Sequence, residues 1–193
     1  MAGASIEEVS LPLTGLALPC YYIIMPAEAS SNLGRYDGLR YANKEGFKEG
    51  ENLLDYYLRN KSTGFGKEAR RRILLGTYVL SAGYYDTYYK KALQVQEAIR
   101  RDFDRVFKQV DYLITPTTPT PAFAIGAKTN DPISMYLADI FTVSADLAGI
   151  PAINLNSGFN QDGLPLGVQL MAGRYQDFSL LDFSEQVENL LQS

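Results

Sequence analysis

Apolar residues recur every three or four positions in several stretches of the chain, and this spacing predicts amphipathic helices. The clearest stripe combines Leu93, Ile99, Phe103, Val106 and Val110. It belongs to a long helical region expected over residues 67–109, with a break at residues 81–83. Further helices are predicted over residues 18–33 with a kink at Pro26, and over residues 53–62, 133–149 and 178–191.

Strands are predicted where apolar residues alternate or run together between turn residues. Residues 6–11 alternate enough for a short strand, and residues 110–116 form an apolar strand that ends at a proline. Residues 152–156 and 166–171 flank the turn sequence NQDG and carry no charge. We expect these last two segments to be buried strands covered on both faces. The order of elements predicts an α/β protein with helices packed on a sheet, with loops over residues 34–52 and 115–132.

Composition excludes several classes of protein. The chain has 193 residues, and 18 basic against 22 acidic side chains give a net charge of −4, too acidic to bind nucleic acid through bulk charge. A single cysteine, Cys20, excludes an internal disulfide and favours a reducing, cytoplasmic compartment. The longest apolar run, Leu16–Ala27, is too short to span a bilayer, and the first residues do not resemble a signal peptide, so no membrane is expected.

Histidine is absent from the chain, which excludes Ser-His-Asp and Cys-His nucleophile systems and histidine zinc sites. The glycine spacings of phosphate-binding loops are also missing. No Gly/Ser-rich loop carries a nucleophilic serine, and the apolar neighbours of Cys20 favour a buried thiol. We therefore expect no catalytic residue, metal or cofactor within this chain.

Two charged residues are better candidates for a binding site. Arg72 ends a run of three arginines and precedes an isoleucine, so it is the one that could point toward the core. Asp139 lies in the apolar sequence YLADIFT. An arginine that forks onto an α-carboxylate and an aspartate that takes an α-ammonium would together hold an amino acid. The alternatives are a solvated basic face for Arg72 and a solvated helix position for Asp139.

Tyrosine is abundant, with 14 residues, and several of them are paired. Most are expected to pack in the core or at its rim with a hydrogen-bonded hydroxyl. A tyrosine near a pocket could line it.

Three segments resemble the amidase signature family, in its branch of tRNA-dependent amidotransferase A subunits. They are YYIIMPAEASSNLGRYDGLRY, GFGKEARRRILLGTYVLSAGYYDTYYKKA and DPISMYLADIFTVSADLAGIPAINL with the following GFNQDGLPLGVQL. The resemblance implies an α/β/α sandwich around a mixed sheet, in which a Ser–cis-Ser–Lys triad hydrolyses glutamine. It further implies that ammonia passes to a B subunit, which uses ATP and Mg²⁺ to activate a misacylated tRNA, and that a C subunit joins A and B.

Only part of this machinery has a counterpart in the chain. The family's catalytic lysine and both serines belong to an N-terminal part that has no match here, so residues 1–193 are expected to form a single partial domain. The resemblance implies glutamine-binding roles for Arg72 with the carboxylate, Asp139 with the α-amino group, and Tyr21 in the pocket. Leu13 stands at a position where the family commonly has a polar residue. A sheet divided in this way is expected to leave an unpaired edge.

Two other functions remain open. The chain could be the same part of another amidase-family hydrolase, although the segment AEASSNLGRYDG argues against it. It could also be a binding or assembly domain without turnover, which the missing triad allows.

Overall fold

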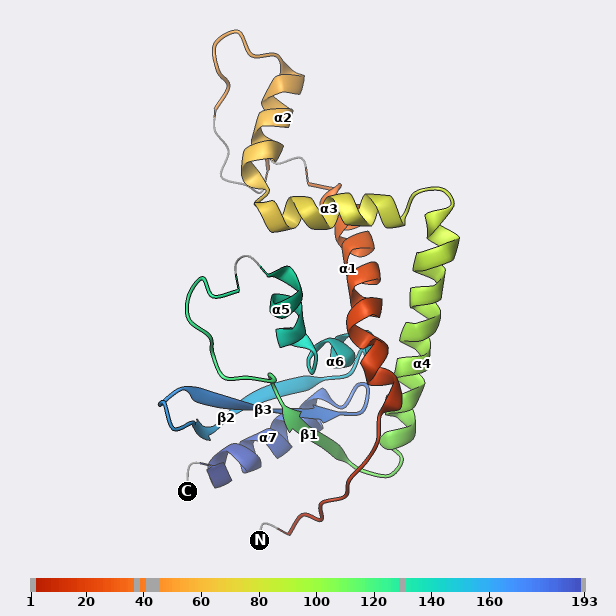
Figure 1. Cartoon of the computed structure of the whole chain (residues 1–193), viewed down its shortest axis with the longest axis vertical. Coiled ribbons are helices and arrows are strands. Elements are labelled where there is room, and N and C mark those ends of the chain that lie inside the picture. Colours follow the sequence, from red (N-terminus) through yellow and green to blue (C-terminus); the bar gives the residue numbers. More distant parts are fainter. Residues whose placement is uncertain (1–2, 37–38, 41–45, 129–130, 192–193) are drawn as a thin grey trace. The chain divides into compact units, whose positions relative to one another are not determined.

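The computed structural model describes residues 3–36, 39–40, 46–128 and 131–191, and Figure 1 shows its elements. Part of the loop predicted over residues 34–52 therefore lies outside the described residues. The chain divides into two compact units. The first unit combines Met1–Cys20 with Gln94–Ser193, and the second unit is Tyr21–Leu93. Each is described by itself, and the single partial domain over residues 1–193 stays a prediction.

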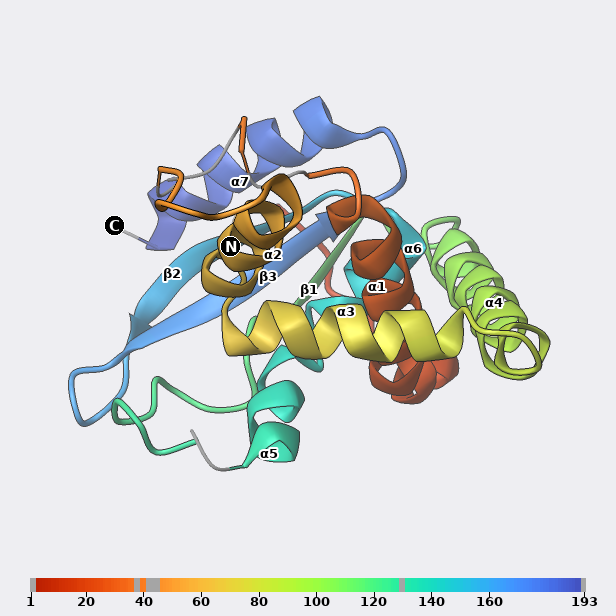
Figure 2. The same ribbon diagram turned by 90° about the horizontal axis from the view of Figure 1, so that it is seen from above.

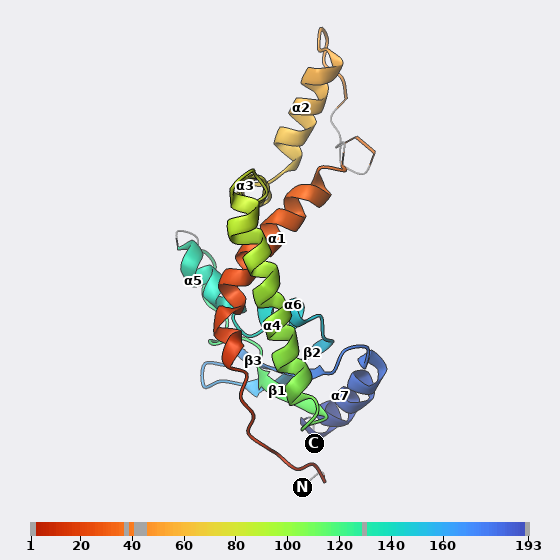
Figure 3. The same cartoon turned by 90° about the vertical axis from the view of Figure 1, so that its right-hand side faces the viewer.

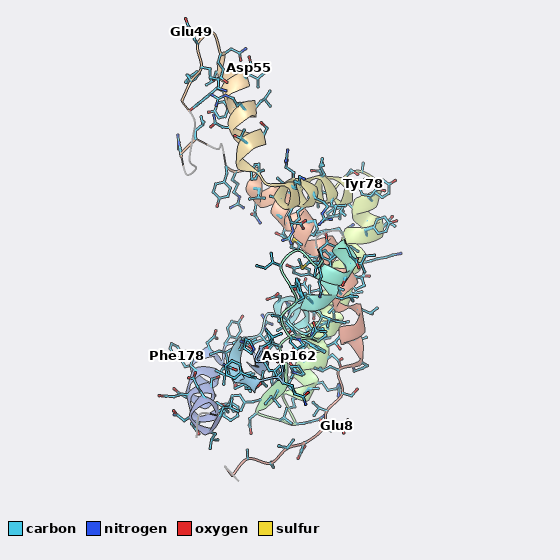
Figure 4. The ribbon with its side chains drawn as sticks, turned by 60° about the vertical axis from the view of Figure 1, so that its left-hand side comes forward. Glu8, Glu49, Asp55, Tyr78, Asp162 and Phe178 are labelled. Carbon is cyan, nitrogen blue, oxygen red and sulfur yellow. The ribbon has the colours of Figure 1, made fainter. Side chains whose placement is uncertain are left out.

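The first unit is built on a three-stranded antiparallel sheet with the order β1-β3-β2. Its strands are β1 (Tyr112–Pro116), β2 (Ala152–Phe159) and β3 (Pro165–Ala172). β2 and β3 form a hairpin around the predicted turn, whose tip carries Asp162 in Figure 4. The predicted α/β class is confirmed, and the strands that the structure describes all pair antiparallel.

The last helix, α7 (Asp177–Leu191), covers one face of this sheet, as Figure 2 shows. Leu155, Leu170, Ala172 and Leu180 form the buried core between them. At one side of this core the rings of Tyr112 and Phe183 stack with their centroids 4.0 Å apart. The alternating side chains of the strands thus place every second residue against the helix.

The expectation that β2 is buried on both faces is wrong. Most of its residues are exposed, and only Leu155 is fully buried. β2 lies at the edge of the described sheet, where α7 covers a single face. β3 is the central strand, and its residues 169–172 are buried, as predicted for this segment.

Helix α4 (Lys90–Val106) carries the predicted apolar stripe. Ile99, Phe103 and Val106 are each at most 1% exposed, whereas Leu93 at the start of the helix is 37% exposed. The stripe is therefore confirmed for the part of α4 that belongs to the first unit.

Two further predictions within the first unit are wrong. Residues 6–11 form no strand, because a strand needs a hydrogen-bonded neighbour and the part of the chain that the structure describes offers none to them. They lead into the short 3₁₀ helix η1 (Pro12–Leu16). The helix predicted over residues 133–149 is divided into α5 (Pro132–Tyr136), η3 (Leu137–Asp139) and α6 (Val143–Ala148), although Gly149 ends it as expected with a left-handed φ of 67°.

The second unit is helical. It contains most of α1 (Ala17–Leu33), then α2 (Leu53–Gly64), α3 (Lys67–Val79) and the π-helical turn η2 (Tyr85–Tyr89). Figure 3 views α3 nearly end-on. The break predicted at residues 81–83 is confirmed, and α1 continues through Pro26 as one helix. The π-helical turn was not expected from the spacing.

Within this unit α1 and α3 approach closely at Gly76. A Cβ atom on Gly76 would lie 1.9 Å from the backbone oxygen of Pro26 and 2.6 Å from Cβ of Ser30. Next to this point the hydroxyls of Ser30 and Thr77 are 3.0 Å apart. The close approach therefore requires glycine at position 76. Among the residues that the structure describes, no helix has the length and apolar character needed to cross a membrane.

Candidate functional site

Arg72 lies in the second turn of α3, which begins after its N-cap residue Gly66. Its Nε donates a hydrogen bond of 2.9 Å to Oε1 of Glu68, one helical turn earlier. Arg71 binds the other carboxylate oxygen of Glu68. Burial alone would raise the pKa of Glu68, but the hydrogen bonds from Arg72 and Arg71 hold it below its usual value. Glu68 is thus a charged partner that orients Arg72.

The Arg72 side chain is 36% exposed, so it lies at the border of the unit rather than within its core. Its bond to Glu68 uses Nε, and the two terminal nitrogens of the guanidinium are not part of that bond. A guanidinium held in this way presents a planar fork, the geometry that binds a carboxylate through two parallel hydrogen bonds. The neighbouring Arg70 is exposed, as expected for an arginine on a solvated face of the helix.

Asp139 is the last residue of η3, at the point where the predicted helix is interrupted. Its side chain is exposed rather than buried among its apolar neighbours. Its backbone oxygen accepts hydrogen bonds from both the amide and the hydroxyl of Thr142, each of 3.1 Å. These two bonds replace the regular helical pattern and fix the turn that carries the carboxylate.

A second carboxylate lies near Asp139. Burial, and then the charge of Asp139, raise the pKa of Asp146 above its usual value. Two carboxylates that repel each other in this way are stabilised by a cation between or beside them. Asp139 and Asp146 thus lie close enough for the charge of Asp139 to affect the Asp146 carboxyl.

Tyr21, the third predicted binding residue, lies in α1 at the start of the second unit and is partly buried. Its ring meets that of Tyr22 edge to face, with centroids 5.3 Å apart and an angle of 88°. This contact fixes the orientation of both rings.

Tyr21 and Arg72 lie in the second unit, and Asp139 lies in the first. Each residue is placed within its own unit only, so the pairing of Arg72 with Asp139 around one amino acid stays a prediction. The same holds for the roles of all three residues.

Cys20 is buried, and burial raises the pKa of its thiol to about 11 against a smaller opposite effect of a hydrogen bond from the Gln96 backbone. A thiol with this pKa stays protonated at neutral pH and is a poor nucleophile. The described residues also include no cluster of three potential metal ligands.

Sequence reasoning missed Gln169, a side chain only 4% exposed at the centre of β3. Its Nε2 donates to the Phe141 carbonyl at 3.2 Å and to Oγ1 of Thr115 at 3.3 Å. A glutamine inside an otherwise apolar strand was the available signal, because a buried amide is costly unless it is hydrogen-bonded.

Known proteins with similar sequences place the chain in a family. A family model described as Amidase matches residues 1–181. The chain is 53% identical over 191 residues to the glutamyl-tRNA(Gln) amidotransferase A subunit of Pelagibacter ubique, covering 98% of this chain and 39% of that protein. It is 55% identical over 186 residues to a glutamyl-tRNA(Gln) amidotransferase A subunit of Clostridium acetobutylicum, covering 96% and 38%. The chain thus spans about two fifths of the length of these relatives.

Solved structures agree with these sequence matches. The crystal structure of the glutamyl-tRNA(Gln) amidotransferase A subunit from Thermotoga maritima superposes with a TM-score of 0.64 at 39% identity, over 92% of this chain and 33% of that one. A structure described as an amidase superposes with a TM-score of 0.69 over 96% and 38% of the two chains. At 22% identity this second match bears on the fold alone.

Proposed function

Since the chain belongs to the amidase family, we propose that it is the glutamine-binding C-terminal part of a tRNA-dependent amidotransferase A subunit. The observation that carries this proposal is the identity of 53–55% over nearly the whole chain to relatives with that name. In the complete protein, glutamine hydrolysis supplies ammonia for converting Glu-tRNA(Gln) or Asp-tRNA(Asn) to the amidated product.

The proposed role of the chain is to hold glutamine rather than to break its amide bond. The guanidinium of Arg72, oriented by Glu68, binds the α-carboxylate through its terminal nitrogens. The carboxylate of Asp139, next to the second charge of Asp146, takes the α-ammonium. Tyr21 lines the pocket. With both ends of the amino acid fixed, the side-chain amide of glutamine is presented to the nucleophile of the N-terminal part.

Partners follow from the same proposal. The B subunit, with ATP and Mg²⁺, uses the ammonia on the misacylated tRNA, and the C subunit joins A to B. No residue of this chain is assigned to those steps.

The test is a glutaminase assay on the purified chain, alone and after mixing with the N-terminal three fifths of the Pelagibacter relative. We expect no ammonia release from the chain alone and release after mixing. In the mixture, Arg72→Lys keeps the charge but loses the fork, so it should raise KM for glutamine about ten-fold or more. Arg70→Lys, at an exposed position of the same helix, is the matched control and should leave KM unchanged.

Three results would contradict the proposal. Hydrolysis by the chain alone would mean that it holds its own nucleophile. A mixture that hydrolyses simple amides but not glutamine would favour another amidase-family hydrolase. A mixture that folds together, binds glutamine and releases no ammonia would favour a binding domain without turnover.

A further inference from the structure

We infer that Gln169 is a positioning residue for the α-amino group of the substrate, acting through the backbone of the turn that carries Asp139. The inference rests on the proposed function, because it assumes that Asp139 binds the α-ammonium of glutamine. The contacts that support it all lie within the first unit.

The first step is the burial of the Gln169 carboxamide. Gln169 is 4% exposed, on the face of β3 opposite to α7, next to the equally buried Met171. An apolar residue would fill this position at no cost in hydrogen bonds, whereas a buried amide is tolerated only with partners. The groups that accept hydrogen bonds from the Gln169 amide therefore indicate the role of this residue.

The main partner is a carbonyl released by the interruption of a helix. Between η3 and α6, the Phe141 oxygen accepts hydrogen bonds from Nε2 of Gln169 at 3.2 Å and from Oγ of Ser144 at 3.3 Å. The central strand of the sheet thus holds this turn through one side chain.

The next step leads from Phe141 to Asp139. Thr142 follows Phe141 directly, and both its amide and its hydroxyl bind the Asp139 backbone oxygen at 3.1 Å. Fixing the Phe141 carbonyl fixes the peptide plane that contains the Thr142 amide. The orientation of η3, and with it the direction of the Asp139 carboxylate, therefore depends on Gln169.

The experiment uses the complex of this chain with the N-terminal part of the relative and compares two substrates. These are glutamine and its analogue without the α-amino group, 4-carbamoylbutanoate. Gln169→Met keeps the volume but removes the donor, and Gln169→Leu removes the donor with a second apolar side chain. For both variants we expect KM for glutamine to rise about ten-fold, with KM for the analogue and both kcat values nearly unchanged.

Control variants distinguish an effect transmitted from Gln169 through the Phe141 carbonyl from a general loss of packing. Thr115→Val removes a different partner of the Gln169 amide, and it should leave the ratio of the two KM values as in the wild type. If the Gln169 variants do not fold, Thr142→Val tests the next contact, since it removes a hydroxyl with little change in shape and should reproduce the selective rise. Adding Gln169→Met to Asp139→Asn should raise KM for glutamine no further, because both changes act on one contact.

A parallel rise of KM for both substrates, no rise in the Gln169 variants, or full additivity with Asp139→Asn would overturn the inference while leaving the proposed function in place. A wild-type complex that does not hydrolyse glutamine would instead contradict the proposed function, and this inference with it.

Discussion

Glu51 is held by a fork of hydrogen bonds from Arg59. Nε and Nη2 of Arg59 lie 2.7 and 2.8 Å from the two carboxylate oxygens. The bonds from Arg59, followed by a bond from the Lys48 amide, lower the pKa of Glu51 from 4.5 to about 2. This pair joins the segment before α2 to the helix itself.

The pair predicts a pH dependence of stability. Because the pKa of Glu51 is lower in the folded state, its contribution is complete above pH 4.5 and is lost as the pH falls toward 2. Glu51→Gln should therefore flatten the fall in the urea midpoint of unfolding between pH 5 and about 2. Glu49→Gln, at the exposed residue labelled in Figure 4, is the control and should retain the wild-type slope. Equal slopes in wild type and Glu51→Gln would show that the pair contributes nothing.

The sequence identifies candidate residues where a charged residue stands among apolar neighbours. It says less about contacts between residues that lie far apart along the chain. Arg72 and Asp139 could be selected because of their apolar neighbours, yet both side chains reach solvent. The pairing of Arg72 with Glu68 follows the four-residue spacing of a helix and could have been predicted from it. The contact from Gln169 to Phe141 could not, because 28 residues separate the two along the chain.

At the scale of elements, the helices with a clear three-to-four spacing appear where they were expected, and the strands at residues 112–116 and 165–172 do as well. Of the wrong predictions, one has a cause in nearby residues and another depends on residues elsewhere in the chain. The helix predicted over residues 133–149 is interrupted because Thr142 binds the Asp139 backbone twice, which competes with helical hydrogen bonds. In residues 6–11, apolar and polar side chains alternate as they do in a strand. These residues form no strand, because an alternating sequence does not by itself provide a neighbouring strand to pair with.

The crossing of α1 and α3 gives a prediction at this scale. Gly76→Ala places a methyl group against the Pro26 carbonyl, a backbone atom that cannot turn away. We expect the free energy of unfolding to fall by about 3 kcal/mol, the upper end of overpacking costs. Urea unfolding followed by circular dichroism measures it.

Gly64→Ala is the matched control, because nothing lies within 4 Å of the added atom at the end of α2. It should change the free energy of unfolding by no more than about 1 kcal/mol. If the two alanine variants unfold alike, the helices do not cross as closely as described.

At the scale of the whole molecule, β1 is an edge strand of the sheet that the structure describes, and its register shows which of its sides is unpaired there. The Thr117 amide donates to the Gly167 carbonyl, so Leu113 and Thr115 also face β3 with their amides. The Ile114 amide then points away from β3, and the Ile114 side chain is 60% exposed. The chain matches 39% of the Pelagibacter relative, so under the proposed function the remaining sequence of such a relative is the candidate to cover this edge.

We therefore expect the Ile114 amide to exchange rapidly with deuterium in the chain alone and slowly in the complex with the N-terminal part of the relative. The amide of Leu113 is the internal control, because its bond to β3 exists in both samples and its exchange should change little. Protection of Ile114 in the chain alone, or rapid exchange in a complex that hydrolyses glutamine, would show that the N-terminal part docks elsewhere.

The proline that ends β1 gives this open edge a further property. Pro116 lies opposite Val168 at a position whose amide would point outward, and a proline has no amide proton to offer. An added strand therefore finds a donor at Ile114 and none at Pro116. Such an interrupted ladder disfavours the indiscriminate stacking of identical chains that leads to amyloid. This single imino acid thus works against the pairing of β1 with copies of itself.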